Sequence, residues 1–296
     1  MIGELYLGVD GGATRCRARI RDAGNRLLGE ASAGPANSRL GIAPAMREVA
    51  AAARAAAAAA GLGEGDLARL HAGLGLAGVT SQREAALVLA ERNPFASVTV
   101  DSDAYAAWLG AFGGQDGAIL IVGTGSCGLA VVDGRRINVG GWGDVVSDDG
   151  SGNAIGRELI RRALWSLEGL APPSGLADAV LARFERDPEK IVAWGATATK
   201  TDFARFAPLV FEHAAKRDPL ALALVEEAAR HVTRMAGRLL DSGTPTVALI
   251  GGLAEPITPW LAPPLRARIV APLADAADGA ILLARRARAA RSRGKP

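Results

Sequence analysis

The first residues that could do chemistry lie near the start of the chain, in the stretch LYLGVDGGATR. An apolar run ends there in Asp10, and the residues that follow are Gly11, Gly12, Ala13 and Thr14. Glycines let backbone N–H groups approach a phosphate, a threonine adds a hydroxyl donor, and one carboxylate can hold a hydrated Mg²⁺. A tight hairpin turn explains the glycines equally well, so this stretch alone leaves both interpretations open.

A second turn of small residues follows another apolar run, AILIV, at residues 118–122. It reads Gly123, Thr124, Gly125 and Ser126, which alone is a weak signal. Around both turns the same plan recurs: an apolar strand, the turn, a second strand, an Asx-type turn and a third strand. Two hairpins of one design predict duplicated domains, and two such turns can grip a polyphosphate. Walker A and Rossmann motifs do not fit, because the GxxxxGK pattern is absent and a strand follows the first turn.

Two acids two residues apart, Asp101 and Asp103, lie where a short apolar strand passes into a helix. Ligands of open α/β sheets bind at the carboxyl ends of strands, so both side chains are candidates for a site. One acid can cap the helix, and the other can act as a general base that takes a proton from a hydroxyl. Position in the sequence leaves open which acid has which role.

The stretch GGWGDVVSDDGS, at residues 140–151, holds three acids and four glycines and is a poor packing element. Asp148 and Asp149 lie just before a predicted helix, whose N-terminus stabilises carboxylates. N-capping accounts for Asp149 or Ser151, whereas Asp148 is predicted to bind a ligand.

A strand near the end of the chain, in the stretch VALIGGL, ends in Gly251 and Gly252. Two glycines present flat backbone on which a purine ring can lie. A simple strand-to-helix turn explains the pair equally well.

Hydrophobic periodicity places these residues on a chain that mixes strands and helices. In the first half we expect strands at residues 5–10, 15–21, 26–31, 70–76 and 98–100. Helices are expected there from Pro44 to near Gly61, from Ser81 to about Arg92, and at 103–112. In the second half we expect strands at 118–122, 129–132, 135–139 and 246–250. The helices expected there are 151–168, 175–186, 202–215, 219–241 and one from about 274.

The length of 296 residues suggests two domains, at roughly 100–200 residues each. Hydrophobic residues make up 49%, enough for a buried core, and aromatic residues only 4%, too few for a platform of stacked bases. The net charge of +3 comes from a basic end, because residues 285–296 hold six basic residues and no acid. The rest carries −3, so we expect no nucleic-acid surface and interpret the basic end as a solvated helix end before a frayed terminus.

The spacing of the cysteines and the lengths of the apolar stretches indicate the cellular compartment of the protein. Cys16 and Cys127 have no CxxC partner or metal-type spacing, so neither a disulfide scaffold nor a zinc site is expected. The start does not read as a signal peptide, and the longest low-polarity stretch, residues 50–60, is shorter than the roughly 20 residues of a membrane span. We therefore expect a soluble, cytoplasmic protein.

Together these stretches resemble the sugar-kinase, hsp70 and actin superfamily of ATPases, and within it the N-acetylglucosamine kinase family of the BadF/BadG/BcrA/BcrD ATPase group. The likeness runs along nearly the whole chain, from GVDGGATR through GTGSCG and GGWGDVVSDDGS to LIGGL. It implies an α/β, actin-like ATPase fold of two ribonuclease H-like domains with an interdomain active-site cleft. The implied lobes are residues 1–115, for sugar and phosphate, and 116–296, for nucleotide. A last helix at about 274–293 could pack back on the first lobe.

The resemblance also implies roles for single residues. Asp10 holds Mg²⁺ through water, and Asp103 is the base that acts on the sugar hydroxyl, with Asp101 as the next candidate. The implied ATP contacts are Gly11, Gly12, Ala13, Thr14, Thr124, Gly125, Ser126, Gly251 and Gly252. The implied sugar contacts are Asn37, Asp103, Gly125, Gly141 and Asp148.

Four positions depart from the family pattern. Ala13 stands where a third glycine is usual, Ser147 replaces a glycine, and Asp149 replaces a glutamate. Ala77 stands where some eukaryotic members have a sugar-contacting serine, which leaves the preferred amino sugar open.

The implied activity is transfer of a phosphoryl group from ATP to the 6-hydroxyl of N-acetylglucosamine, or of glucosamine, with ATP and Mg²⁺ as cofactors. The expected partners are the small amino sugar, ATP and a second copy of the chain in a homodimer, without nucleic acid or membrane. The alternative in the same group is an ATPase that activates a partner enzyme and holds an iron–sulfur cluster, although Cys16 and Cys127 belong to no cluster motif. A third possibility, a sugar-sensing regulator, would normally show a helix-turn-helix segment.

Overall fold

The computed structural model describes residues 3–293 and divides the chain into two compact units. The first unit takes the residues up to Asp116 and adds those from Ala271 onward, and the second unit is Gly117–Val270. The lobes expected from the sequence were 1–115 and 116–296, with a last helix able to return to the first lobe. In the structure, the residues from Ala271 belong to the first unit.

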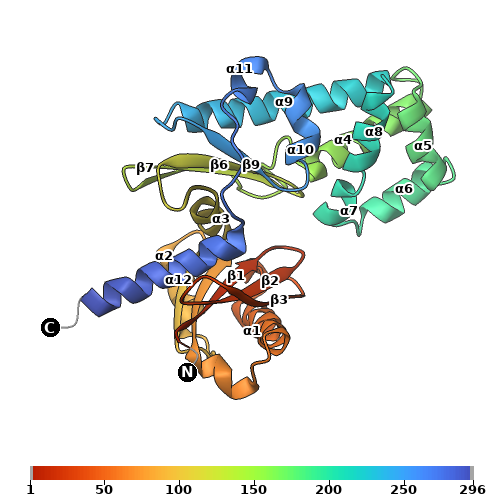
Figure 1. The fold of residues 1–296 in the computed structure, drawn as a ribbon. Helices are drawn as coiled ribbons and strands as arrows, with labels where there is room; N and C mark the ends of the chain where they lie inside the picture. Colours follow the sequence, from red (N-terminus) through yellow and green to blue (C-terminus); the bar gives the residue numbers. More distant parts are fainter. Residues whose placement is uncertain (1–2, 294–296) are drawn as a thin grey trace. The chain divides into compact units, whose positions relative to one another are not determined.

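The first unit is built on a five-stranded sheet with the strand order β3-β2-β1-β4-β5 (Figure 1). Its strands are β1 (Leu5–Gly11), β2 (Cys16–Asp22), β3 (Leu27–Ala33), β4 (Leu70–Leu76) and β5 (Ser97–Ser102). β2 runs antiparallel to β1 and β3, whereas β4 is parallel to β1 and β5 is parallel to β4. The carboxyl ends of β1, β4 and β5 therefore share one edge, where such sheets bind ligands.

Helices cover both faces of this sheet. On one face, α1 (Ile42–Ala59) packs its alanine-rich side against the apolar side chains of β1 and β2. On the other face lie α3 (Asp103–Phe112) and α12 (Ala276–Arg293). The strands carry Gly8 and Gly73 under α12, where a Cβ on either would come within 2.0 Å of a carbonyl oxygen of that helix. The remaining elements are η1 (Ser38–Leu40), η2 (Glu64–Arg69) and α2 (Gln82–Ala90).

The second unit repeats the plan in a four-stranded sheet with the order β8-β7-β6-β9. Its strands are β6 (Gly117–Val122), β7 (Ser126–Val132), β8 (Arg135–Gly140) and β9 (Val247–Ile250). β7 runs antiparallel to β6 and β8, and β9 is parallel to β6. A parallel bridge between Val247 and Ile269 stands where the first unit has β5. The predicted repeat of strand, turn, strand and strand is therefore confirmed.

The second unit is otherwise helical, as expected, but its middle differs from the prediction. Its helices are α4 (Gly152–Leu167), α5 (Gly175–Arg183), α6 (Pro188–Gly195), α7 (Lys200–Ala204), α8 (Ala207–Ala215), α9 (Pro219–Leu240), α10 (Ala254–Ile257), η3 (Thr258–Trp260) and α11 (Pro263–Arg266). The single helix expected at 202–215 is wrong, because Pro208 lies in the first turn of a new helix, where its missing N–H is tolerated. The sequence patterns also missed α6. Between residues 3 and 293, none of the helices is long and apolar enough to cross a membrane.

The basic end is not simply the solvated helix end that its composition suggests. Arg285 donates to the backbone carbonyl of Asp22 at 2.7 Å, and its guanidinium lies 4.7 Å from the centre of the Tyr6 ring. Arg288 pairs with Glu4 at 2.9 Å. All of these residues belong to the first unit, so the basic side chains help to hold α12 on that sheet. The frayed terminus that we expected lies outside the described residues.

Candidate functional site

Acids from distant parts of the sequence gather at the carboxyl edge of the first sheet. In the register of the parallel strands, Asp10 of β1 lies opposite Gly75 of β4, and Gly75 lies opposite Asp101 of β5. Asp103 follows two residues later as the first residue of α3. The fold therefore brings two of the predicted chemical stretches to one edge of one unit.

Asp103 has an environment that suits a general base. Burial raises the pKa of its carboxyl, and the negative charge of Asp10 raises it further, against a hydrogen bond from the Ala104 N–H at 2.8 Å. A carboxylate whose pKa rises toward neutral is a better proton acceptor. Ser102 caps α3 by accepting from the Tyr105 N–H at 3.1 Å, so a serine takes the capping role that we allowed for one of the acids.

Asp10 fits a magnesium ion that is held through water. Its side chain is 31% exposed at the end of β1, and its Oδ2 lies 3.4 Å from Nη2 of Arg17. Burial raises the pKa of the Asp10 carboxyl, and the charge of Arg17 opposes that rise. Mg²⁺ keeps several waters and takes few protein carboxylates, so one partly exposed carboxylate suits it. Among residues 3–293, no cluster of three or more His, Cys, Asp or Glu side chains could hold a metal.

The first turn closes on itself and against the segment that follows β3. The Gly12 N–H donates to the Arg15 carbonyl at 2.9 Å, and the Gly12 carbonyl accepts from the Ala36 N–H at 3.1 Å. Thr14 is exposed at the tip of the turn. Ala13 keeps a negative φ, which any L-residue adopts, so alanine fits without strain where the family pattern has glycine.

Asn37 lies beside this turn because its segment bridges to the end of β4. Asn37 and Ala77 form a parallel bridge, and the Ala77 N–H donates to the Gly11 carbonyl at 2.7 Å. The Asn37 Oδ1 accepts from the Arg39 N–H at 3.0 Å and caps η1. The amide N–H groups of Asn37 are not used in that cap, so they suit a hydroxyl or carbonyl acceptor on a ligand.

In the second unit, two backbone segments converge on the turn after β6. The Gly152 N–H donates to the Gly123 carbonyl at 2.8 Å, and the Asn153 N–H donates to the Thr124 carbonyl at 3.1 Å. The first turn of α4 therefore lies against the small-residue turn. A Cβ on Gly123 would lie 4.0 Å from the nitrogen of Gly252, so the predicted adenosine glycines are also close. A small-residue turn beside a helix N-terminus suits the oxygens of a phosphate.

Asp148 has an unusual backbone and little exposure. It is 5% exposed and has a φ of 66°, a left-handed conformation that is uncommon outside glycine. Its carboxylate packs on Gly125, where a Cβ would come within 2.7 Å of Oδ2. Strained backbone of this kind clusters at functional sites. Ser151, and not Asp149, caps α4 by accepting from the Ala154 N–H at 3.2 Å.

Two other predicted contact residues hold the loop in place. Ser126 is 3% exposed, and its hydroxyl donates to the Asp149 carbonyl at 2.8 Å. Gly141 packs so closely that a Cβ on it would lie 2.7 Å from the Cβ of Cys127. These contacts tie both ends of the loop at residues 140–151 to the start of β7.

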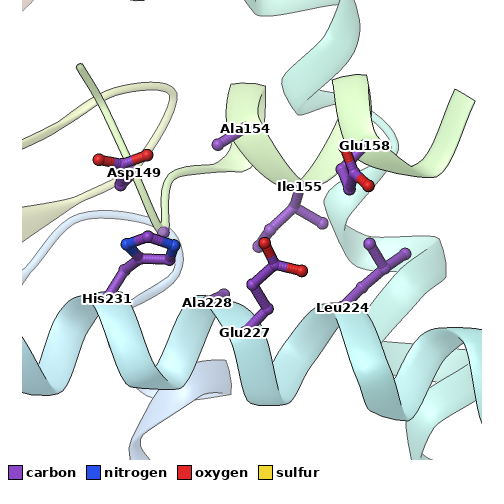
Figure 2. Close-up of a pocket in the computed structure, with 9 residues that line it drawn as sticks. Asp149, Ala154, Ile155, Glu158, Leu224, Glu227, Ala228 and His231 are labelled. Atoms are coloured by element: carbon purple, nitrogen blue, oxygen red, sulfur yellow. The ribbon is translucent and has the colours of Figure 1, made fainter. Parts of the chain in front are cut away.

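Two hollows in the second unit were not foreseen from the sequence. An open groove of about 660 Å³ follows α9 and is lined by Glu226, Ala229, Arg230, Thr233, Arg234, Trp260 and Ala262. A cavity of about 160 Å³ lies between α4 and α9, and Figure 2 shows the side chains of Asp149, Glu158, Glu227 and His231 around it. The lining residues that belong to α9 recur every three or four positions and so share one face of that helix. This spacing could not predict the groove, because any exposed helix face has it.

Comparison with known proteins places the chain among ATPases. Residues 7–284 match the BadF/BadG/BcrA/BcrD ATPase family. The glucosamine kinase GspK of Vibrio cholerae serotype O1 is 41% identical over 281 residues, which cover 95% of this chain and 96% of that protein. An N-acetylmuramic acid/N-acetylglucosamine kinase of Clostridium acetobutylicum is 25% identical over 239 residues and 77% of each chain.

Solved structures share the fold. A Chromobacterium violaceum protein, whose assignment as an N-acetylglucosamine kinase is itself a proposal, has a TM-score of 0.90 and 36% identity, covering 96% of this chain and 100% of that chain. A ROK family glucokinase from Streptomyces griseus, solved with glucose and AMPPNP, has a TM-score of 0.56 and 21% identity, covering 96% and 99%. At that identity the likeness shows the fold alone. The two-domain, actin-like α/β fold class expected from the sequence is confirmed.

Proposed function

The chain belongs to the BadF/BadG/BcrA/BcrD ATPase family, and we propose that it is an ATP-dependent kinase that phosphorylates the 6-hydroxyl of an amino sugar. Two relatives over most of its length are named as amino-sugar kinases, which supports this class of activity. The sequence resemblance put N-acetylglucosamine first and glucosamine second. We propose the reverse order here, because the relative that is 41% identical is a glucosamine kinase.

The observation that carries the chemical step is the environment of Asp103, a partly buried residue whose carboxyl has its pKa raised by desolvation. It follows β5 at the carboxyl edge of the parallel strands β1, β4 and β5. In the proposed step, Asp103 takes the proton of the sugar hydroxyl while the hydroxyl oxygen bonds to the γ-phosphorus. The bond from that phosphorus to the bridging oxygen breaks, and ADP leaves. Positioning and electrostatic stabilisation dominate phosphoryl transfer, and a general base adds about 10²–10⁴-fold.

Bound Mg²⁺ neutralises charge on the phosphates during transfer. We propose that Asp10 holds the hydrated ion, which its partly exposed carboxylate supports. The first turn, from Gly11 to Thr14, would contact phosphate oxygens with backbone N–H groups and one hydroxyl. In the second unit, Thr124 and Gly125 would do the same beside the N-terminus of α4.

The sugar and the nucleoside are assigned to different groups. We propose that Asn37 donates its amide N–H groups to the sugar, and that Asp148, held against Gly125, accepts from sugar hydroxyls. The nucleoside is proposed to lie on the glycines at 251–252.

An assay of ADP release tests this proposal with glucosamine, N-acetylglucosamine, N-acetylmannosamine and glucose in turn. We expect ADP release that requires an amino sugar, with the highest kcat/KM for glucosamine. Nuclear magnetic resonance of the product should show the phosphate ester on C6. ADP release that no sugar stimulates would contradict the kinase, and an ester on another carbon would contradict the 6-hydroxyl assignment.

The alternative of a partner-activating ATPase requires cysteine thiolates to hold an iron–sulfur cluster. Cys16 is fully buried in β2, and burial raises the pKa of its thiol to about 12, which opposes thiolate formation. The chemistry of this cysteine therefore favours the kinase. Iron in the purified protein would support the activator instead.

A further inference from the structure

One face of β2 carries three arginines, Arg17, Arg19 and Arg21, which we call the arginine ladder. Side chains alternate along a strand, and the residues between them belong to the core that packs on α1. The arginine ladder thus lies on the opposite face, toward the start of α12. Arg19 lies 2.8 Å from both Asp275 and Asp278 and 2.8 Å from Glu30. Arg21 lies 2.6 Å from Asp278.

Arg17 is the member of the arginine ladder that reaches the candidate site. Its Nη2 lies 3.4 Å from Oδ2 of Asp10, and its Nη1 lies 3.0 Å from Oδ2 of Asp275. The side chain is 24% exposed, and its Nε is buried without a partner among the described residues. The guanidinium is therefore held by its two Nη groups: Nη2 faces Asp10, and Nη1 faces Asp275 and, at 4.0 Å, Glu30.

This arrangement restrains the carboxylate of Asp10 through one of its two oxygens only. The contact uses Oδ2, and no hydrogen bond from the described residues to Oδ1 is present. A forked guanidinium can bridge two carboxylates in a defined geometry, which a single ammonium does not. Asp275 and Glu30 also contact this guanidinium, so the charge of Arg17 is shared among three carboxylates and does not neutralise Asp10 alone.

We propose that Arg17 is a positioning residue that orients Asp10, so that Oδ1 stays available to the hydrated Mg²⁺ of the bound nucleotide. This inference rests on the proposed function, because it takes Asp10 as the residue that holds the ion. The arginine ladder then has two roles. Arg19 and Arg21 hold α12 on the sheet through ion pairs, and Arg17 links the segment before α12 to Asp10 at the candidate site.

The test compares Arg17→Gln, Arg17→Lys and Arg21→Gln in the full chain. Arg21→Gln is the matched control, because Arg21 pairs with Asp278 and not with Asp10. One readout is the Kd of Mn²⁺ in the presence of ADP, measured by electron paramagnetic resonance. The second readout is Tm, which reports the loss of an ion pair in either variant.

We expect Arg17→Gln to raise the Kd of Mn²⁺ by about 10–100-fold, the usual effect of losing a residue that orients a metal ligand. The Mg²⁺ concentration for half-maximal turnover should rise in parallel, with little change in the KM for sugar. Arg17→Lys should restore only part of the Mn²⁺ affinity. Arg21→Gln should lower Tm as Arg17→Gln does and leave the Kd of Mn²⁺ unchanged.

A wild-type Kd of Mn²⁺ in Arg17→Gln would overturn the inference and leave Arg17 a purely structural residue. The variant Asp10→Asn distinguishes failure of the role proposed for Arg17 from failure of the metal role of Asp10 and from failure of the proposed function. A wild-type Kd in Asp10→Asn would overturn the metal role of Asp10, and the inference with it. If both variants weaken Mn²⁺ binding while no sugar is phosphorylated, the inference stands and the proposed function fails.

Discussion

The turns after β1 and β6 share one strand plan but carry different chemistry. In the first unit, the strand before the turn carries an acid, Asp10, as its residue before last, and the next strand carries the arginine ladder. In the second unit, the corresponding strand ends in Ile121 and Val122, and the buried acid Asp148 comes from a loop. The same topology therefore supports a charged strand end in one unit and an apolar strand end in the other.

The difference shows what each arrangement requires. An acid at a partly buried strand end needs a counter-charge, and β2 supplies it in the first unit. Asp275, just before α12, and Asp278, within it, balance the arginines. The second unit has a helix N-terminus beside its turn, and Gly125 leaves room for the carboxylate of Asp148. We therefore expect the first unit to be sensitive to changes of charge and the second to added volume.

The largest expected effect is from Asp103→Asn in the first unit. It should lower kcat by about 10²–10⁴-fold, the usual contribution of general-base catalysis, and leave nucleotide binding intact. Burial raises the pKa of this carboxyl above its unfolded value, so stability falls as the pH rises from the unfolded pKa to the folded pKa, and the full penalty is present above it. Asn removes that penalty, and Tm at pH 7 should be unchanged or higher.

Measurements of kcat, ADP binding and Tm check this prediction, with Asp101→Asn as the matched variant. Asp101→Asn should lower kcat less than Asp103→Asn. Near-normal turnover in Asp103→Asn together with a large loss in Asp101→Asn would assign the base to Asp101.

The second effect tests volume in the second unit with Gly125→Ala. The added Cβ would lie 2.7 Å from the Asp148 carboxylate, so that carboxylate must move. A displacement of about 1 Å can cost roughly 10²-fold in catalysis, and we expect a fall of that order in kcat/KM for the sugar. Gly195→Ala is the control, because a Cβ there meets no atom within 4 Å. Similar kcat/KM values for the two variants would remove Asp148 from the sugar site.

The third effect tests charge in the first unit through the pH dependence of kcat. The base must be ionised, so kcat should fall as the pH falls through the raised pKa of Asp103. Arg39 lowers that pKa, and Arg39→Gln should therefore move the acid limb of the profile to higher pH. Arg26→Gln, which removes the partner of Asp22 at the far hairpin, should leave the profile in place. A shift to lower pH in Arg39→Gln would contradict the electrostatic account.

The smallest effect concerns the interior of the second unit at Asn153. This side chain is 2% exposed, and its Oδ1 has no partner in the described part of the chain. Leaving such a group unpaired costs about 1–3 kcal/mol, so Asn153→Leu should raise Tm by about 2–4 °C per kcal/mol recovered. Asn138→Leu, the same change at an exposed position on β8, should give no such rise. A lower Tm in Asn153→Leu alone would show that the carboxamide is paired in solution.

Local patterns predicted the strands around both turns well, because alternation and apolar runs depend on neighbouring residues alone. The prediction failed where two short helices meet, since the boundary at Phe206 depends on Pro208 and on packing in the core. The alternation of arginines in β2 predicted a strand. It could not predict the acids that pair with them, because Asp275 lies 256 residues after Arg19. The groove and cavity along α9 were equally hidden, since their lining comes from several elements.

By itself, the sequence determined where the small-residue turns lie, which acids stand at strand ends, and that two hairpins share one design. These features depend on the order of neighbouring residues and on the two-residue period of a strand. Only the tertiary structure decided that α12 returns to the first sheet, that Arg17 is shared by Asp10 and Asp275, and that Asp148 is buried against Gly125. The charge balance and the pKa of each acid depend on burial and on partners brought from far along the chain, and folding alone brings them together.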